Sequence, residues 1–212
     1  MTTNLKEDVA MTTNMKKKYD LSTRLKITLL GVIAFIIMFL ELPLPIFPVF
    51  LKIDVSGVPA LIAGFALGPV AGVLVGLLKN VLHLLKTSTM GVGELANFIV
   101  GAAIVIPSSI IYRKDKSRVS AIKGLIVGSV CMALMGAFAN YFILIPFYEK
   151  AMGFPVAAVV GMGSAINHAI VDLPTFILYA IIPFNLLKGI IVSVVTVMLY
   201  KYVSPLLNKG LR

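Results

Sequence analysis

Residues 60–76 read Ala-Leu-Ile-Ala-Gly-Phe-Ala-Leu-Gly-Pro-Val-Ala-Gly-Val-Leu-Val-Gly, an apolar stretch with a Gly68-Pro69 pair at its middle. Proline cannot continue the hydrogen-bond ladder of a helix, and a Gly-Pro pair is a strong breaker. We therefore expect two shorter helices, 55–68 and 69–86. One observation favours a single long helix instead, because glycines recur every four residues from Gly64 to Gly76 and would form one small-residue face.

The composition around this stretch is that of a membrane protein. Of the 212 residues, 59% are apolar and 13% are charged, whereas an ordinary soluble domain is about 25% charged. The 19 Lys+Arg against 9 Asp+Glu give a net charge of +10. The basic residues form short clusters between long apolar runs, a pattern typical of cytoplasmic loops and not of a nucleic-acid interface.

The apolar runs predict an all-α integral membrane protein, a bundle of six transmembrane helices. The segment before the second helix contains Pro43, Pro45 and Pro48 and cannot be helical. Unpaired amides cannot face lipid, so we expect this long loop, 41–54, to pack on protein or to cover a cavity as a lid. The six expected spans are 24–42, 55–68, 69–86, 94–112, 119–145 and 184–203.

The distribution of charge supports the break at Gly68-Pro69. With it, the N-terminal segment, the 113–123 loop and the C-terminal end share one side and hold 14 basic and 4 acidic residues. By the positive-inside rule that side is cytoplasmic, so both termini are expected inside. A single helix would move the 113–123 cluster outside. We expect a cytoplasmic segment 1–23, one membrane domain 24–203 in the cell membrane, and a cytoplasmic tail 204–212.

The least informative stretch lies between Pro146, which we expect to end the fifth helix, and Pro183, which precedes the sixth. It carries scattered polar residues in apolar sequence. An outer loop with helical pieces and a short re-entrant hairpin both remain open.

Catalytic motifs are absent from the sequence. There is no H-E-x-x-H, no P-loop, no G-x-S-x-G and no cysteine pair. We therefore expect no enzyme, no metal site and no cofactor, and an ATP-using step would need another protein.

Polar residues inside apolar helices cost free energy and by default mark a ligand path. On the expected topology several lie at the outer ends of helices, beside the outer loop that carries Lys52 and Asp54. We predict a pocket that opens outward there. The alternative is that the lysines extend to the headgroups and the asparagines cap helices. The helix residues concerned are Lys79, Glu94, Asn97, Asn140, Asn185 and Lys188.

Asn185 and Lys188 stand at i and i+3, expected on the first turn of the last helix, and so share one face. An amide donates and accepts, and an ammonium adds donors. Together they suit a planar imide-like edge with alternating C=O and N–H. Aromatic residues could hold a flat ring between them, or belong to an interfacial belt; these are Phe47, Phe50, Tyr141 and Phe142.

Several segments resemble the substrate-binding S components of energy-coupling factor (ECF) vitamin transporters. The general resemblance lies in Leu51-Lys-Ile-Asp54 after a Pro-rich loop, in Gly68-Pro-Val-Ala-Gly72 and in Gly93-Glu-Leu-Ala-Asn-Phe98. The combination of Asn140-Tyr-Phe142 with Ile182-Pro-Phe-Asn-Leu-Leu-Lys-Gly189 looks like the riboflavin-specific members.

The resemblance implies a six-helix bundle that binds riboflavin, as transported ligand, from outside, with the first loop as lid. It implies Asn140, Asn185 and Lys188 at the isoalloxazine edge. Asp54 and polar groups near Glu94 and Asn97 are implied for the ribityl hydroxyls. The implied partner is a module of one transmembrane scaffold protein and two ATPases, whose ATP cycle topples the S component. Docking in the family uses small residues on the first helix, here Gly31 and Ala34.

Three alternatives remain at this stage. The ligand could be another vitamin or small heterocycle. The chain could be a small self-sufficient secondary transporter or channel, although its cytoplasmic halves hold almost no titratable groups. It could also be a membrane enzyme that uses His83 or His168 with Glu94 or Asp172, although nothing in the sequence sets these at catalytic spacing.

Overall fold

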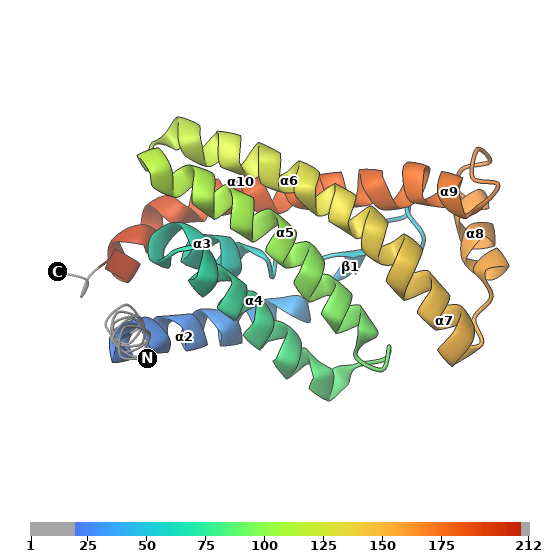
Figure 1. Ribbon diagram of the computed structural model, residues 1–212, viewed down its shortest axis with the longest axis horizontal. Coiled ribbons are helices and arrows are strands. Elements are labelled where there is room, and N and C mark those ends of the chain that lie inside the picture. The colour runs from blue at the N-terminus through green and yellow to red at the C-terminus, as the bar shows by residue number, and fades with distance from the viewer. Residues whose placement is uncertain (1–19, 209–212) are drawn as a thin grey trace, which may run out of the picture.

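The structure, a computed structural model, describes residues 20–208, so most of the expected 1–23 segment and the end of the expected tail lie outside it. The described part is a helix bundle with one short β-ribbon (Figure 1). Its strands are β1 (Leu42–Pro43) and β2 (Lys52–Ile53). Its helices are α2 (Leu21–Met38), α3 (Val58–Leu67), α4 (Pro69–His83), α5 (Val92–Asp115), α6 (Arg118–Ala139), α7 (Ile145–Met152), α8 (Val156–Ser164), α9 (Leu173–Phe176) and α10 (Ile182–Asn208).

Five of the described helical runs are long and apolar enough to cross a membrane. The short helix α3 has 10 residues, fewer than the about 20 that a bilayer core requires. Six spanning helices therefore remain a prediction, whereas five candidates are found. These are Leu21–Met38, Pro69–Lys86, Val92–Asp115, Arg118–Met152 and Leu173–Val203.

The break at Gly68-Pro69 is confirmed. Helix α3 ends at Leu67, α4 begins at Pro69, and Gly68 between them has φ +115°, a conformation that favours glycine. The two helices form a hairpin in which a Cβ on Gly72 would lie 3.0 Å from the Gly64 Cα. Gly64 and Gly72 thus contact each other inside the hairpin, and the repeated glycines do not form one face of a continuous helix.

Two other helix boundaries that we expected from prolines are wrong. The chain stays helical through Pro146 as far as Met152, and the last membrane run begins at Leu173, ten residues before Pro183. A π-helical turn precedes each proline, at Asn140–Leu144 and at Ile177–Ile181. An i−5 turn relieves the clash between a proline ring and the carbonyl four residues earlier, so the helix continues.

The stretch between these prolines forms a loop with helical pieces. Helix α7 ends at Gly153, whose φ is +63°. The short helices α8 and α9 follow, and the Asp172 side chain caps α9 by accepting from Thr175 N at 2.8 Å. They lie with α7 at one end of the bundle (Figure 1).

The proline-rich loop 41–54 packs on protein and lines a cavity, as expected. Phe47, Leu51 and Ile53 are buried, and Phe47 packs edge-on against Phe184 of α10 with centroids 5.4 Å apart. The ribbon β1–β2, which the sequence did not indicate, pairs Leu42 with Ile53. The loop is therefore an ordered wall, and its movement as a lid is a separate prediction.

The start of α2, the turn between α5 and α6, and the end of α10 lie at the same end of the bundle (Figure 1). Arg113, in the last turn of α5, donates to the Ala66 carbonyl near the end of α3, at 3.4 Å. An aromatic cluster fills this end, where Phe65 stacks on Tyr112 (4.5 Å between centroids) and the Tyr112 hydroxyl donates to Tyr200 Oη at 3.1 Å. The basic segments thus share one end.

Gly31 and Ala34 do not lie on an outward surface. Ala34 is fully buried, and a Cβ on Gly31 would lie 2.5 Å from the Leu78 side chain of α4. These small residues let α2 and α4 pack closely. The coupling surface that we expected here is therefore inside the bundle in this structure.

Candidate functional site

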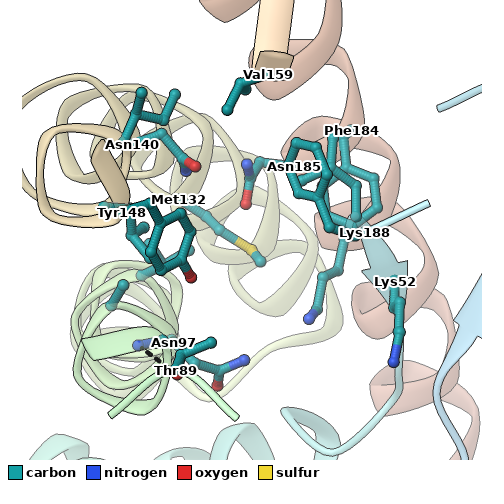
Figure 2. Close-up of a pocket in the computed structure, with 18 of the residues that line it drawn as sticks. Lys52, Thr89, Asn97, Met132, Asn140, Tyr148, Val159, Phe184, Asn185 and Lys188 are labelled. Carbon is teal, nitrogen blue, oxygen red and sulfur yellow. Dashed lines mark hydrogen bonds between the residues drawn. The ribbon is translucent and has the colours of Figure 1, made fainter. Parts of the chain in front are cut away.

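A cavity of about 500 Å³ opens in the half of the bundle away from the α5–α6 turn. The loop 41–54 and helices α4, α5, α6, α7, α8 and α10 all contribute to its wall (Figure 2). Its volume lies within the about 300–1,000 Å³ of small-molecule sites. Of the seven expected ligand-binding residues, five line it: Lys79, Asn97, Asn140, Asn185 and Lys188.

Two amides face one another across the upper part of this cavity, from Asn140 and Asn185 (Figure 2). Each donates one Nδ2–H to the carbonyl four residues earlier, Gly136 O at 2.8 Å and Ile181 O at 2.9 Å. This bond fixes the amide plane and leaves the other N–H and the Oδ1 free to bind a ligand. Gly136 makes the approach possible, because a Cβ there would lie 2.6 Å from Asn185 Nδ2.

We had expected Asn185 and Lys188 on the first turn of the last helix. Instead, both asparagines lie within long helical runs. Asn185 lies four residues after the π-helical turn of the long run 173–203, and Asn140 begins the other π-helical turn. Such turns often occur at functional sites because they redirect the following side chains. The sequence could not show this redirection.

The ammonium group of Lys188, which lines the cavity, forms an ion pair with a carboxylate that lies behind the wall. Its Nζ is 2.6 Å from Asp54 Oδ2. The other Asp54 oxygen accepts from the backbone and hydroxyl of Ser56, and that hydroxyl also accepts from Lys79 Nζ at 2.6 Å. One buried carboxylate thus serves two ammonium groups, and Asp54 does not itself line the cavity.

The electrostatics of Asp54 follow from these contacts. Burial raises the pKa of its carboxyl, but the Lys188 and Lys79 ammonium groups and the hydrogen bonds from Lys188 and Ser56 outweigh burial. The net result is a pKa below the ordinary value. Asp54 therefore stays ionised, and the group Asp54–Lys79–Lys188 carries one excess positive charge when both lysines are protonated.

Glu94 lies outside the cavity wall. Its Oε1 is 3.0 Å from His83 Nδ1, and its Oε2 accepts from the hydroxyls of Thr87 and Thr89 at 2.8 and 3.1 Å. The carboxylate ties the α4–α5 turn together, and of this group Thr89 lines the cavity. The sequence analysis considered His83 with Glu94 only in the enzyme alternative, and their separation of eleven residues did not predict this contact.

The rest of the wall is mostly apolar, with Lys52 and Thr89 as further polar residues, and was only partly foreseen. Phe50 of the loop lines the cavity as expected, but Phe47 packs behind it, and Tyr141 and Phe142 are exposed on the outside of the bundle. Helical spacing gave no sign of the apolar residues that do line it. They include Ile104, Met132, Tyr148, Met152, Phe154, Met162 and Phe184.

Comparisons with known proteins agree with this architecture. The sequence matches the family described as "ECF transporter, substrate-specific component" over residues 25–200. The riboflavin transporter RibU of Staphylococcus aureus (strain TCH60) is 37% identical over 196 residues, which cover 92% of this chain and 96% of that protein. The riboflavin transporter FmnP of Bacillus subtilis (strain 168) is 34% identical over 182 residues, which cover 84% of this chain and 90% of that protein.

A solved structure, of the S component of a bacterial ECF transporter, superposes with a TM-score of 0.69 at 35% sequence identity. The match covers 88% of this chain and 98% of that chain. Together with the apolar helices, these matches make the chain a multi-pass membrane protein and a transporter subunit, not an enzyme. The chain belongs to the family of substrate-specific components of ECF transporters.

Proposed function

We propose that this chain is the riboflavin-binding subunit of an ATP-driven ECF-type uptake transporter in the cell membrane. It captures the vitamin on the extracellular side with high affinity. It delivers the vitamin by reorientation when docked on a module of one transmembrane scaffold protein and two ATPases. The observation that carries the proposal is the cavity wall formed by Asn140, Asn185 and Lys188. The names of the relatives RibU and FmnP support riboflavin as the ligand.

The wall suits the edge of a flavin ring. That edge alternates C=O and N–H groups, so it needs both donors and acceptors. Asn140 and Asn185 each retain one donor and one acceptor after their backbone bonds, and Lys188 adds donors. Met132 and Phe184 supply apolar surface beside these groups for the ring faces (Figure 2).

The other predicted residues take more distant roles. Asn97 and Lys79 line the cavity and are candidates for the ribityl hydroxyls. Asp54 and Glu94, which we expected at the ligand, would act from behind the wall. Asp54 orients Lys188, and Glu94 holds the turn that carries Thr89.

The proposed orientation rests on charge. The end of the bundle opposite the cavity carries the basic turn with Arg113 and Arg118 and is proposed to face the cytoplasm, with both termini. Docking through Gly31 and Ala34 would require α2 to move away from its neighbours, because Gly31 packs against Leu78 of α4 and Ala34 is fully buried.

The first experiment is an absorbance spectrum of protein purified from cells grown with riboflavin, followed by a fluorescence titration. We expect yellow protein that quenches flavin fluorescence at about a 1:1 ratio. Colourless protein without quenching would show that riboflavin is not the ligand, while the membership of the family would stand. Mass spectrometry of the bound molecule would then identify another vitamin or heterocycle. Uptake by the chain alone in proteoliposomes, without ATP or partners, would contradict the dependence on a module.

Variants of the wall locate the binding. Lys188→Met keeps the stem and removes the donors, and Asn185→Leu removes both amide roles. Each is expected to weaken riboflavin binding by about 1–3 kcal/mol, the cost of leaving a buried polar partner unpaired. Unchanged affinity in both variants would show that these two side chains do not bind the ligand and have a structural role only.

A pair of glycine substitutions supplies a matched steric control. Gly101 lines the cavity, Gly161 is exposed on α8, and a Cβ at either position meets no atom within 4 Å. Gly101→Phe is expected to fill the cavity and abolish binding, whereas Gly161→Phe leaves the affinity unchanged. Equal affinity in the two variants would place the ligand elsewhere.

A further inference from the structure

Asn80, in the second half of α4, carries a buried acceptor without a protein partner. The side chain is 4% exposed, and its Nδ2 donates to the Gly76 carbonyl at 2.8 Å. Its Oδ1 is fully buried and accepts no hydrogen bond from any described residue. Buried amide oxygens in proteins are nearly always paired, with protein or with ordered water.

A second, small cavity has Asn80 in its wall. It has a volume of about 20 Å³ and lies between α4, α5 and the start of α3. A water molecule needs at least about 10–15 Å³ of such space and two to four polar partners. The polar side chains in the wall are Lys79, Asn80 and Asn97.

The hydrogen-bonding capacity of these three side chains matches one water. Lys79 has three N–H donors, and in the described structure one of them is used, on Ser56 Oγ. The amide of Asn97 makes no hydrogen bond among the described residues and can donate or accept. A water molecule can accept from Lys79 and donate to Asn80 Oδ1 at the same time. A metal ion does not fit, because an ammonium group lines the cavity and no carboxylate does.

We propose that this cavity binds one ordered water molecule that bridges Lys79, Asn80 and Asn97. Lys79 and Asn97 line the large cavity as well. The water therefore connects α4 to α5 directly behind the larger site and holds two of its polar side chains in place.

The direct test is a crystal structure of the ligand-free protein at a resolution that shows ordered water. We expect one density peak within hydrogen-bonding distance of Asn80 Oδ1 and Lys79 Nζ, and its loss in Asn80→Leu. A wild-type cavity without density, or closed by an Asn97 amide bonded directly to Asn80, would overturn the proposal. The test requires no riboflavin, so it can fail or succeed independently of the proposed function.

The melting temperature of Asn80→Leu distinguishes a bound water from an unpaired Asn80 Oδ1, because the two predict different changes. If water bridges the three groups, Asn80→Leu removes the water and leaves Lys79 donors unpaired, so the melting temperature falls by at least about 2 °C. If Oδ1 is truly unpaired, replacing it by an apolar group leaves the melting temperature unchanged or raises it. Thr196→Val is the control. It removes another buried bond to a carbonyl four residues earlier, Val192 O, on helix α10, which does not line the small cavity.

Discussion

Two buried carboxylates lie near the cavity, and they connect different parts of the molecule. Asp54 in the loop contacts Lys188, 134 residues away on α10, and reaches Lys79 of α4 through Ser56. Glu94 contacts residues within the single turn between α4 and α5. Both are almost completely buried, at 5% and 6% exposure.

The difference shows that burial alone does not tell what a charged residue does. Asp54 pairs directly with Lys188 and, through Ser56, with Lys79, so the loop, α4 and α10 depend on one carboxylate. The partners of Glu94 are hydroxyls and one imidazole close in sequence. We therefore expect changes at Asp54 to affect both stability and ligand binding, and changes at Glu94 to act locally.

The largest expected effect is that of Asp54→Asn. It leaves Lys188 and Lys79 buried without a counter-charge, and removing one partner of a buried ion pair costs about 3–5 kcal/mol. The unfolding free energy in detergent, measured with a denaturant, should fall by about this amount, and riboflavin binding should weaken as Lys188 loses its orientation. In the double variant Asp54→Asn/Lys188→Gln part of the loss should be recovered, because the unpaired charge is gone. Equal losses in single and double variants would contradict the pairing.

The pH dependence of stability gives the next effect. The pKa of Asp54 is lowered in the folded protein, so the ionised carboxylate stabilises the fold fully above the ordinary Asp value of about 4. This stability is lost as the pH falls below that value toward the folded pKa. Melting curves at decreasing pH should show this loss in the wild type, and a weaker one in Asp54→Asn. Hydrogen bonds from Thr23 and Thr175 also lower the pKa values of the exposed Asp20 and Asp172, so these two carboxylates contribute to the slope that remains in the variant.

The smallest effect is expected for Glu94→Gln. Glutamine retains an acceptor for Thr87 and Thr89 but loses the charge that strengthens these bonds, a difference of about 1 kcal/mol. The unfolding free energy should fall by that amount, and riboflavin affinity should stay within about twofold of the wild type. A loss of affinity as large as in Asp54→Asn would show that Glu94 also serves the ligand directly.

Three prolines show how far sequence patterns predict this fold. Pro69 follows a glycine that can adopt φ +115°, so the chain turns there and the prediction is correct. Pro146 and Pro183 follow apolar residues that stay helical by means of a π-helical turn. In all three cases the sequence tells us that the proline lacks a backbone N–H donor. Packing against the other helices decides whether the chain turns or continues.

The candidate site shows the same division. Polar residues in apolar helices pointed to Lys79, Asn97, Asn140, Asn185 and Lys188, and all five line one cavity. The same argument could not separate a residue in the wall from one behind it, because Asp54 and Glu94 carry the same polar signal. The apolar lining had no signal, since every apolar residue of a membrane helix has the same pattern whether it faces lipid, core or ligand.

The sequence by itself determined the apolar helical character, the turn at Gly68-Pro69 and the basic cluster between the helices α5 and α6. These depend on backbone limits, hydrophobicity and charge, which each short segment carries within itself. Only the tertiary structure decided that Asp54 pairs with Lys188, that two helices continue through proline, and that Gly31 and Ala34 face inward. Those outcomes depend on which distant side chains come into contact. The free energy of such a contact depends on both segments, so neither segment alone predicts it.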